Sequence, residues 1–319
     1  MHDAATGTNV HQHTLSTGLA IVVAITAAIV VGAAQREPHD PTLFHGSVDL
    51  VNVGVTVAGK KQRLVTNLTV NDFAVYEDGK SQPIFAFASG AQPGPPLHVG
   101  VLLDVSASQE LDLGFTRNAV IKFLTSMPEA VDMTFIDFAS QVRGGRYGQS
   151  DFPRLVNRVR SLTAGGDTAL YDAIGVYLDG ASEQDGRKVM VLYTDGGDTQ
   201  SSLGLGSLMK LLKASDVTVY AIGALEKQSQ RSQLIQRALL AQIAEATGGT
   251  AFFPSSVKDL DRIYEQVLGE VRAQYTIGYV SSNDTSDGAW RKVDVKITRA
   301  DARDLRIRAR KGYYAPSKP

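Results

Sequence analysis

The chain contains no cysteine in 319 residues. This absence excludes disulfide bonds, metal sites built on thiolates, a cysteine nucleophile and lipid attachment through cysteine, while it fits any redox compartment. An excess of charge of either sign is also missing, since 32 basic and 33 acidic residues leave a formal net charge of -1. The composition therefore gives no electrostatic reason to expect nucleic acid or an anionic membrane surface as a partner.

Positive charge is missing from residues 1–18, where a secretory signal normally carries it. The apolar run Leu19–Val31 follows and continues into Gly32-Ala33-Ala34. The run is short for a membrane span of about 20 residues and suits the core of a signal peptide, with the small residues as a cleavage site. We therefore expect residues 1–34 to be a cleaved signal peptide or, alternatively, an uncleaved membrane anchor. A wrongly assigned start codon is the third alternative.

Both main alternatives for residues 1–34 imply export, to the periplasm, to the outside, or to the membrane with the domain outside. Such an anchor is the only membrane contact that we expect. Residues 35–46 are polar, contain Pro38 and Pro41, and are predicted to be a linker.

The remaining chain is long enough, at 43% hydrophobic residues, to form about two domains with a real core. Residues 47–90 show a period of two, with valine at every second position from Val51 to Val57, and Gly-rich turns. This pattern predicts a small β-rich unit. Residues 274–319 return to the strand pattern. We expect these two segments to pair into one β-sandwich, with another domain inserted between them.

The inserted domain, residues 97–273, follows a boundary rich in proline and glycine at residues 90–96. Apolar strands alternate there with helical patterns, which predicts an α/β fold, doubly wound, with a mostly parallel sheet and helices on both faces. Within this domain we expect the first helix to bury Phe115, and we expect Arg143–Arg146 to form a tight hairpin. One later helix is expected to start near Gln233. The last helix is expected to start at Ser256, with Asp259 as its capping-box partner.

Oxygen-bearing side chains gather at the ends of two predicted strands. The buried strand in VGVLLDVSAS ends at Asp104, followed by Ser106 and Ser108. Thr194 and Asp195 follow the predicted strand Val189–Tyr193, and Thr168 lies in a Gly-Gly loop before a helix. Ligand sites in open α/β sheets lie outside the carboxyl ends of the strands. If the strand order joins these loops, the five side chains form an oxygen shell suited to Mg²⁺.

These motifs, Asp-x-Ser-x-Ser, Gly-Gly-x-Thr-Ala-Leu and Thr-Asp-Gly, resemble the metal-ion-dependent adhesion site of von Willebrand factor type A (VWA) domains over residues 97–273. The flanking sequences LTVNDFAVYEDGKSQ and QYTIGYV to RARKGYYAP resemble those of exported bacterial proteins with a VWA-related domain. One departure is Ala107, where glycine is usual; alanine is tolerated unless that residue must adopt a left-handed conformation.

The resemblance implies that Mg²⁺, or alternatively Mn²⁺ or Ca²⁺, is held by Asp104, Ser106, Ser108, Thr168 and Asp195. It also implies that the two aspartates act partly through water and that an Asp or Glu of a protein partner fills an open coordination position. On this reading the protein is a binding or adhesion module of the cell envelope and no residue is catalytic.

Two alternatives to metal-dependent binding stay open. One is a metal-free interaction scaffold with a vestigial site. The other is a Mg²⁺-dependent hydrolase, because Asp104, Lys188 and the Asp195/Asp198 pair follow the order of parts in haloacid-dehalogenase-type phosphatases. Those enzymes need an acid two residues after the nucleophile, and Ser106 stands there, which cannot act as a general acid at neutral pH.

Overall fold

The computed structural model describes residues 50–90 and 94–317. The predicted signal peptide or anchor and the predicted linker lie outside these residues. None of the helices in the described ranges is both long enough and apolar enough to span a membrane.

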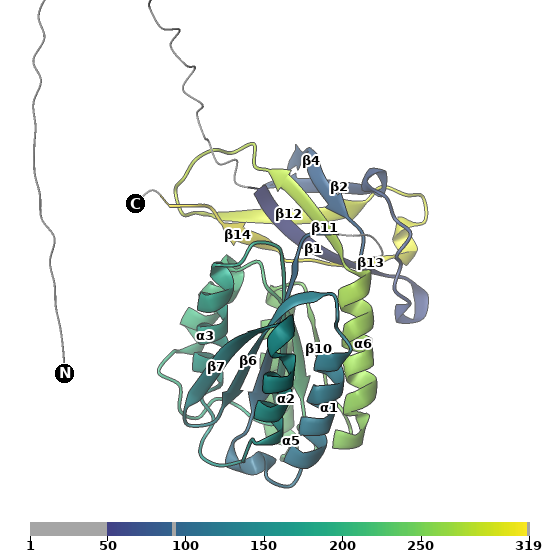
Figure 1. Cartoon of the computed structure of the whole chain (residues 1–319). Coiled ribbons are helices and arrows are strands. Elements are labelled where there is room, and N and C mark those ends of the chain that lie inside the picture. Colours follow the sequence, from purple (N-terminus) through teal and green to yellow (C-terminus); the bar gives the residue numbers. More distant parts are fainter. Residues whose placement is uncertain (1–49, 91–93, 318–319) are drawn as a thin grey trace, which may run out of the picture. The chain divides into compact units, whose positions relative to one another are not determined.

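A six-stranded sheet forms the α/β part, in the order β10-β9-β8-β5-β6-β7. Figure 1 labels its strands β6, β7 and β10. All its strands are parallel except β7, which runs antiparallel to β6 at one edge. The strands are β5 (Leu97–Asp104), β6 (Ala130–Phe138), β7 (Val142–Gly148), β8 (Arg187–Thr194), β9 (Thr218–Gly223) and β10 (Thr250–Phe252). Because β5 pairs with β6 on one side and with β8 on the other, its carboxyl end lies among the carboxyl ends of neighbouring parallel strands and not at the outer edge of the sheet.

Helices cover both faces of this sheet, as predicted. They are α1 (Leu113–Thr125), α2 (Phe152–Arg160), α3 (Leu170–Ser182), α4 (Leu205–Ala214), α5 (Gln230–Ala246) and α6 (Leu260–Ala273). One core packs α1, α2 and α6 against the sheet, and the other packs α3, α4 and α5. In β5, Val101 and Leu103 face the first core and Leu102 the second, so the strand is apolar throughout because both its faces are buried.

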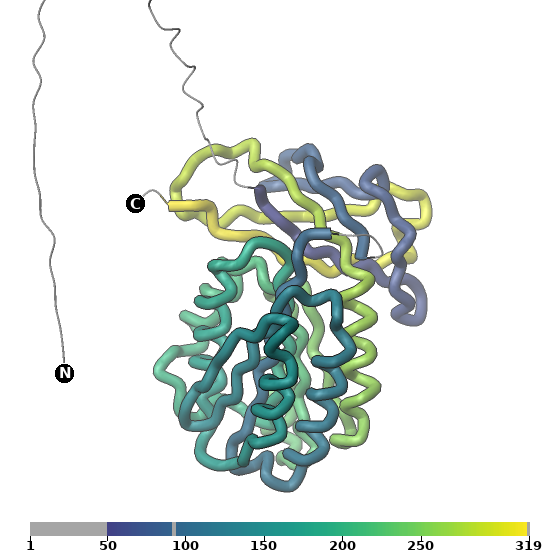
Figure 2. Tube along the Cα trace, in the orientation of Figure 1, coloured from purple at the N-terminus to yellow at the C-terminus, as the bar shows by residue number. Residues whose placement is uncertain are grey.

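Two four-stranded antiparallel sheets make up the rest, in the orders β13-β1-β11-β4 and β14-β12-β2-β3. Their strands are β1 (Leu50–Ala58), β2 (Phe73–Glu77), β3 (Lys80–Gln82), β4 (Ile84–Ala88), β11 (Tyr275–Val280), β12 (Trp290–Ile297), β13 (Arg306–Arg308) and β14 (Gly312–Tyr314). Both sheets combine strands from before and after the α/β part, and Figure 2 shows the purple segment that follows residue 50 beside the yellow C-terminal strands. The predicted sandwich of the two segments is confirmed.

Four local predictions were wrong. Phe115 is 56% exposed, and Thr116 occupies the buried position on α1 instead. Residues Arg143–Arg146 lie within β7 and not in a tight hairpin, because Val142 already pairs with Phe138 and the chain turns at residues 139–141.

The other two corrections concern helix starts. Helix α5 begins at Gln230 because the hydroxyl of Ser229 accepts a hydrogen bond from the Ser232 amide and caps it there. Helix α6 begins at Leu260, after a short 3-10 turn at Val257–Asp259. The Asp259 carboxylate accepts from the amide and hydroxyl of Ser255, one residue earlier than the expected partner.

Candidate metal site

Backbone hydrogen bonds hold three loops together at the carboxyl end of β5. The Gly165 amide donates to the Val105 carbonyl at 2.9 Å, and the Ala107 amide donates to the Gly166 carbonyl at 3.0 Å. The Thr199 amide donates to the Thr168 carbonyl at 2.9 Å, which joins the loop after β8 to the same group. The loops that carry the five predicted ligands are therefore neighbours.

Asp104 is fully buried at the end of β5, with 0% of its surface exposed. Its Oδ1 accepts from the Ser106 amide at 2.9 Å, and its Oδ2 accepts from the Thr194 hydroxyl at 2.6 Å. Burial raises the pKa of Asp104 to about 6, against the lowering effect of the hydrogen bonds from Ser106 and Thr194. Among the described residues no Lys, Arg or His forms a salt bridge with this carboxylate. A buried carboxylate without a counter-charge is costly, and a bound cation would relieve that cost.

Three further oxygens lie in a row beside Asp104. The Ser106 and Ser108 hydroxyl oxygens are 3.1 Å apart, and the Ser108 hydroxyl donates to Asp195 Oδ1 at 3.0 Å. Adjacent ligands in a Mg²⁺ octahedron with bonds of about 2.1 Å lie about 3 Å apart, so the three side chains fit neighbouring corners. Burial raises the pKa of Asp195 as well. The donor set, hydroxyls and carboxylates, is that of a hard cation.

Thr168 lies on the adjoining loop and is nearly buried. Its amide donates to the Thr199 hydroxyl at 2.9 Å, which fixes the backbone. In the described part of the chain its own hydroxyl makes no hydrogen bond to the other four predicted ligands. The structure thus joins Asp104, Ser106, Ser108 and Asp195 directly and places Thr168 on a loop bonded to theirs.

The backbone at position 107 does not require glycine, the residue that is usual there in the family that the sequence resembles. Ala107 opens the short helical turn Ala107–Gln109, and it is not among the residues with positive φ. The alanine methyl group therefore imposes no backbone strain at this position.

Two residues that the sequence analysis did not select also shape the site. Thr194 orients Asp104 and accepts from the Gly196 amide at 3.2 Å. The Gln228 side chain donates to the Asp195 backbone carbonyl. The signal for Thr194 was its position directly before Asp195, whereas nothing in the sequence connects Gln228 with this loop.

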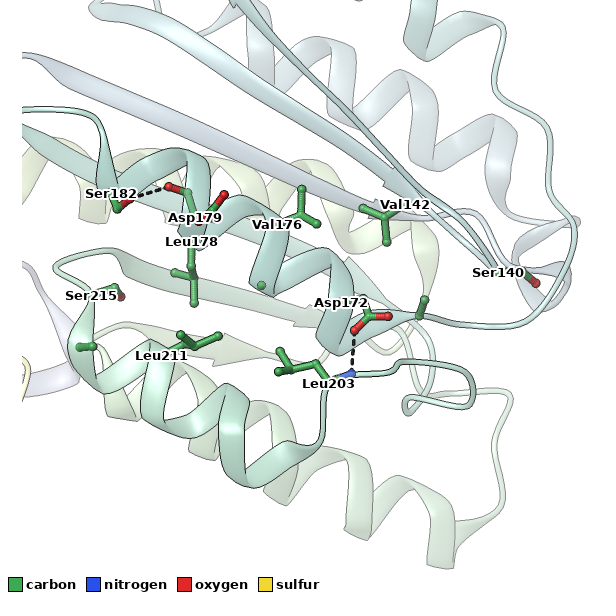
Figure 3. Close-up of a pocket in the computed structure, with 13 residues that line it drawn as sticks. Ser140, Val142, Asp172, Val176, Leu178, Asp179, Ser182, Leu203, Leu211 and Ser215 are labelled. Atoms are coloured by element: carbon green, nitrogen blue, oxygen red, sulfur yellow. Dashed lines mark hydrogen bonds between the residues drawn. The ribbon is translucent and has the colours of Figure 1, made fainter.

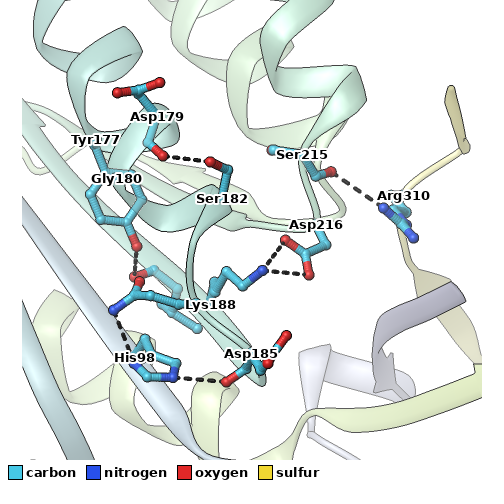
Figure 4. A network of polar contacts seen from close by, with 12 residues as sticks. His98, Tyr177, Asp179, Gly180, Ser182, Asp185, Lys188, Ser215, Asp216 and Arg310 are labelled. Atoms are coloured by element: carbon cyan, nitrogen blue, oxygen red, sulfur yellow. Dashed lines mark hydrogen bonds and ion pairs between the residues drawn. The ribbon is translucent and has the colours of Figure 1, made fainter. Parts of the chain in front are cut away.

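Asp198 and Lys188 have other roles. Asp198 accepts hydrogen bonds from the Tyr171 amide at 3.2 Å and from Ser201, so it fastens the start of α3. Lys188 lies near the start of β8 and pairs with Asp216 at 2.8 Å (Figure 4). Its neighbour on β5 is His98, six residues before Asp104, or about 20 Å along the strand. Lys188 is therefore too distant to act with Asp104, and the phosphatase arrangement is wrong for this residue.

Within residues 50–90 and 94–317, no three His, Asp or Glu side chains gather as metal ligands. The group at the end of β5 differs from such a cage because hydroxyls supply most of its donors. A centre of this kind leaves the charge of a divalent ion incompletely neutralised.

A parallel α/β sheet with an oxygen-rich crevice at the carboxyl ends of its strands defines a class of ligand-binding domain. The model of the von Willebrand factor type A domain family matches residues 98–266, and the chain belongs to this family. No curated protein sequence matches the chain.

Several solved structures are similar at low identity. A von Willebrand factor type A protein from Catenulispora acidiphila is 13% identical with a TM-score of 0.49, over 80% of this chain and 75% of that one. An aerotolerance-related membrane protein from Bacteroides fragilis is 18% identical with a TM-score of 0.45, over 55% and 98%. The pilus adhesin SpaC from Lactobacillus rhamnosus GG is 13% identical with a TM-score of 0.49, over 77% and 48%.

Proposed function

We propose that this protein is a metal-dependent protein-binding module of the cell envelope, which uses Mg²⁺ to capture an Asp or Glu side chain of a partner. The observation that supports the proposal most is the buried carboxylate of Asp104, which forms no salt bridge with the rest of residues 50–90 and 94–317 and lies beside the oxygens of Ser106, Ser108 and Asp195. Mn²⁺ or Ca²⁺ could take the same place, since both prefer oxygen ligands.

The residues present favour an ion that stays electrophilic. Ser106, Ser108 and Thr168 would be neutral ligands, and both oxygens of Asp104 already accept hydrogen bonds, which suits a ligand that acts through water. The bound ion would polarise an incoming oxygen at an open position. A carboxylate of another protein is the strongest such donor among common side chains, so binding would depend on an exposed acidic residue.

Binding fits the site better than catalysis, and we assign no catalytic residue. Asp198, three residues after Asp195, holds the start of α3 and accepts hydrogen bonds from the amides of Tyr171 and Ser201. Ser106 stands where a phosphatase needs its acid. A metal-free scaffold is the second candidate, and it is supported by the hydrogen bonds that already satisfy Ser108.

Isothermal titration of the purified protein with Mg²⁺ and Mn²⁺ separates these functions. The Asp104→Ala, Ser106→Ala double variant should lose the binding heat. Asp167→Asn removes an exposed carboxylate from the same group of loops without touching the four joined ligands, and it should keep the heat. Equal heats for the wild type and the double variant would contradict the metal site and favour the scaffold. Phosphatase turnover that disappears in Asp104→Asn would favour the hydrolase.

We also propose that the protein is exported. The support is the sequence pattern of residues 1–34, which lie outside the described residues. Fractionation of cells that express the full chain, with an antibody against the α/β part, tests this expectation: recovery from the cytoplasm alone would contradict it.

A further inference from the structure

The outer edge of β7 is open in the part of the chain that the structure describes. β7 (Val142–Gly148) ends the six-stranded sheet and pairs only with β6 (Figure 1). It is seven residues long and most of its residues are exposed or half-buried. The open edge of an antiparallel strand presents backbone N–H and C=O groups that can pair with another extended chain.

Positive charge is concentrated along this edge. Residues 142–160, from β7 through α2, contain five arginines and one acidic residue, in a chain whose formal net charge is -1. Arg143 and Arg158 share one carboxylate, Asp137, at 2.7 Å each. The other three arginines of the segment form no salt bridge within the described ranges. Arg146 lies in β7 and Arg154 lies beside Tyr147 of β7, whereas Arg160 lies against Phe115 and Asn118 of α1, away from this edge. The edge therefore carries uncompensated positive charge.

The side of β7 toward α2 carries most of these arginines. Arg158 of α2 donates to the Arg143 carbonyl at 2.7 Å and to the Tyr147 hydroxyl at 3.0 Å. The Arg154 guanidinium lies 5.8 Å from the centre of the Tyr147 ring. Because side chains alternate along a strand, Arg143, Gly145 and Tyr147 share this side.

The side of β7 toward α3 is more apolar. Val142 contributes to a cavity of about 780 Å³ together with Val176 of α3 and Leu211 of α4 (Figure 3). Val176 is 50% exposed and Leu211 is 43% exposed, so this apolar surface is open to solvent. The single arginine on this side, Arg146, donates to the Gly180 carbonyl at 2.7 Å.

We propose that the β7 edge binds an extended segment of a partner protein in which acidic and apolar residues alternate. The segment adds as a seventh strand, with its acidic side chains toward the arginines of α2 and its apolar side chains toward Val142 and Val176. Gly144 and Gly145 lie in the middle of the edge, and a Cβ at Gly145 would be 3.1 Å from Nη1 of Arg158, so this guanidinium lies close to the edge on the side toward α2. The same arginines repel one another when two β7 edges meet, which disfavours a second copy of this chain as the occupant.

The test uses the whole protein in EDTA, so that its outcome is independent of the metal site. The probe is the fluorescein-labelled peptide acetyl-EVEVEVE-amide, and its binding is followed by fluorescence polarisation. We expect saturable binding that weakens with salt and falls at least about tenfold in Arg154→Glu, which reverses a charge on the side toward α2. Arg303→Glu reverses an exposed charge in another part of the chain and should bind as the wild type does.

Two control peptides separate strand addition from simple attraction to negative charge. The peptide EEVVVEE has the same composition as EVEVEVE but lacks the alternation. The second control is EVEVEVE methylated at alternate amide nitrogens, which keeps the charge but lacks the N–H donors along one edge of the strand. Both should bind at least about tenfold more weakly. Failure of EVEVEVE to bind, equal binding of either control peptide, or an unchanged affinity in Arg154→Glu would each overturn the proposal. So would a dimer, detected by sedimentation, that the Arg154→Glu substitution abolishes.

Discussion

At the residue scale, the chemistry of the candidate metal site depends on a few hydrogen bonds between loops. The candidate ligand residues could be selected from motif spacing because strand ends and polar residues coincide in the sequence, and the structure joins Ser106, Ser108 and Asp195 beside Asp104. The contact between Thr194 and Asp104 could not, because it depends on β5 and β8 lying side by side, which only the strand order establishes.

We expect Thr194→Val to weaken Mg²⁺ binding about tenfold, because Asp104 loses the donor that orients it. Titration calorimetry measures the change. Thr194→Ser keeps the hydroxyl and should bind nearly as well as the wild type. Equal affinities for the valine and serine variants would show that the hydrogen bond does not support the site.

Gly100 in β5 has a packing role that the sequence did not reveal. A Cβ at this position would lie 2.0 Å from the ring of Tyr177, whose hydroxyl donates to the Val189 carbonyl at 3.1 Å. We expect Gly100→Ala to lower the free energy of unfolding by about 3 kcal/mol or more, because the buried ring has to move.

Urea denaturation followed by circular dichroism tests the Gly100 prediction. Gly114→Ala is the matched control, since a Cβ there meets nothing within 4 Å on the surface of α1. That variant should be neutral or slightly more stable, because alanine favours the helix. A wild-type midpoint for Gly100→Ala would mean that Tyr177 does not require the space.

At the element scale, β7 is the clearest case in which the sequence pattern misled. Gly-Gly flanked by arginines is typical of a turn, because glycine weakens a strand interior. The segment is a strand nonetheless, since Asp137 on β6 pairs with Arg143 directly opposite and also with Arg158 of α2. Ion pairs between distant elements leave no local periodicity in a sequence.

Asp137→Asn should destabilise the protein by about 3 kcal/mol, because two arginines lose a carboxylate that is only 2% exposed. Thermal unfolding and hydrogen exchange of the β7 amides report the effect. Asp179→Asn removes an exposed carboxylate from α3 and serves as the control. Unchanged exchange in β7 would show that this ion pair does not hold the edge strand.

At the scale of the whole molecule, the two β-rich segments were predicted to pair because both are rich in strand patterns and flank the α/β part. The structure adds the residue that joins them. Glu77 of β2 is 2% exposed and accepts from the hydroxyls of Tyr279 on β11 and Tyr313 on β14, both at 2.8 Å. In the sequence, Glu77 precedes an Asp-Gly turn. That turn does not indicate that the glutamate is buried or that it bonds to two other strands.

Glu77→Ala should lower the free energy of unfolding by about 3 kcal/mol, because buried hydroxyls from two other strands lose a charged acceptor. Chemical denaturation measures this loss, with Glu183→Ala, an exposed residue at the end of α3, as the control. If both variants unfold at the same denaturant concentration, the junction does not contribute to the pairing of the two segments.

Anomalous diffraction from crystals of the protein grown with Mn²⁺ is the most direct test of the metal site. We predict one peak at the carboxyl end of β5, in contact with the hydroxyls of Ser106 and Ser108 and beside Asp195, with Asp104 bound directly or through water. The absence of a peak at that position, or a peak only elsewhere in the molecule, would contradict a metal-dependent function.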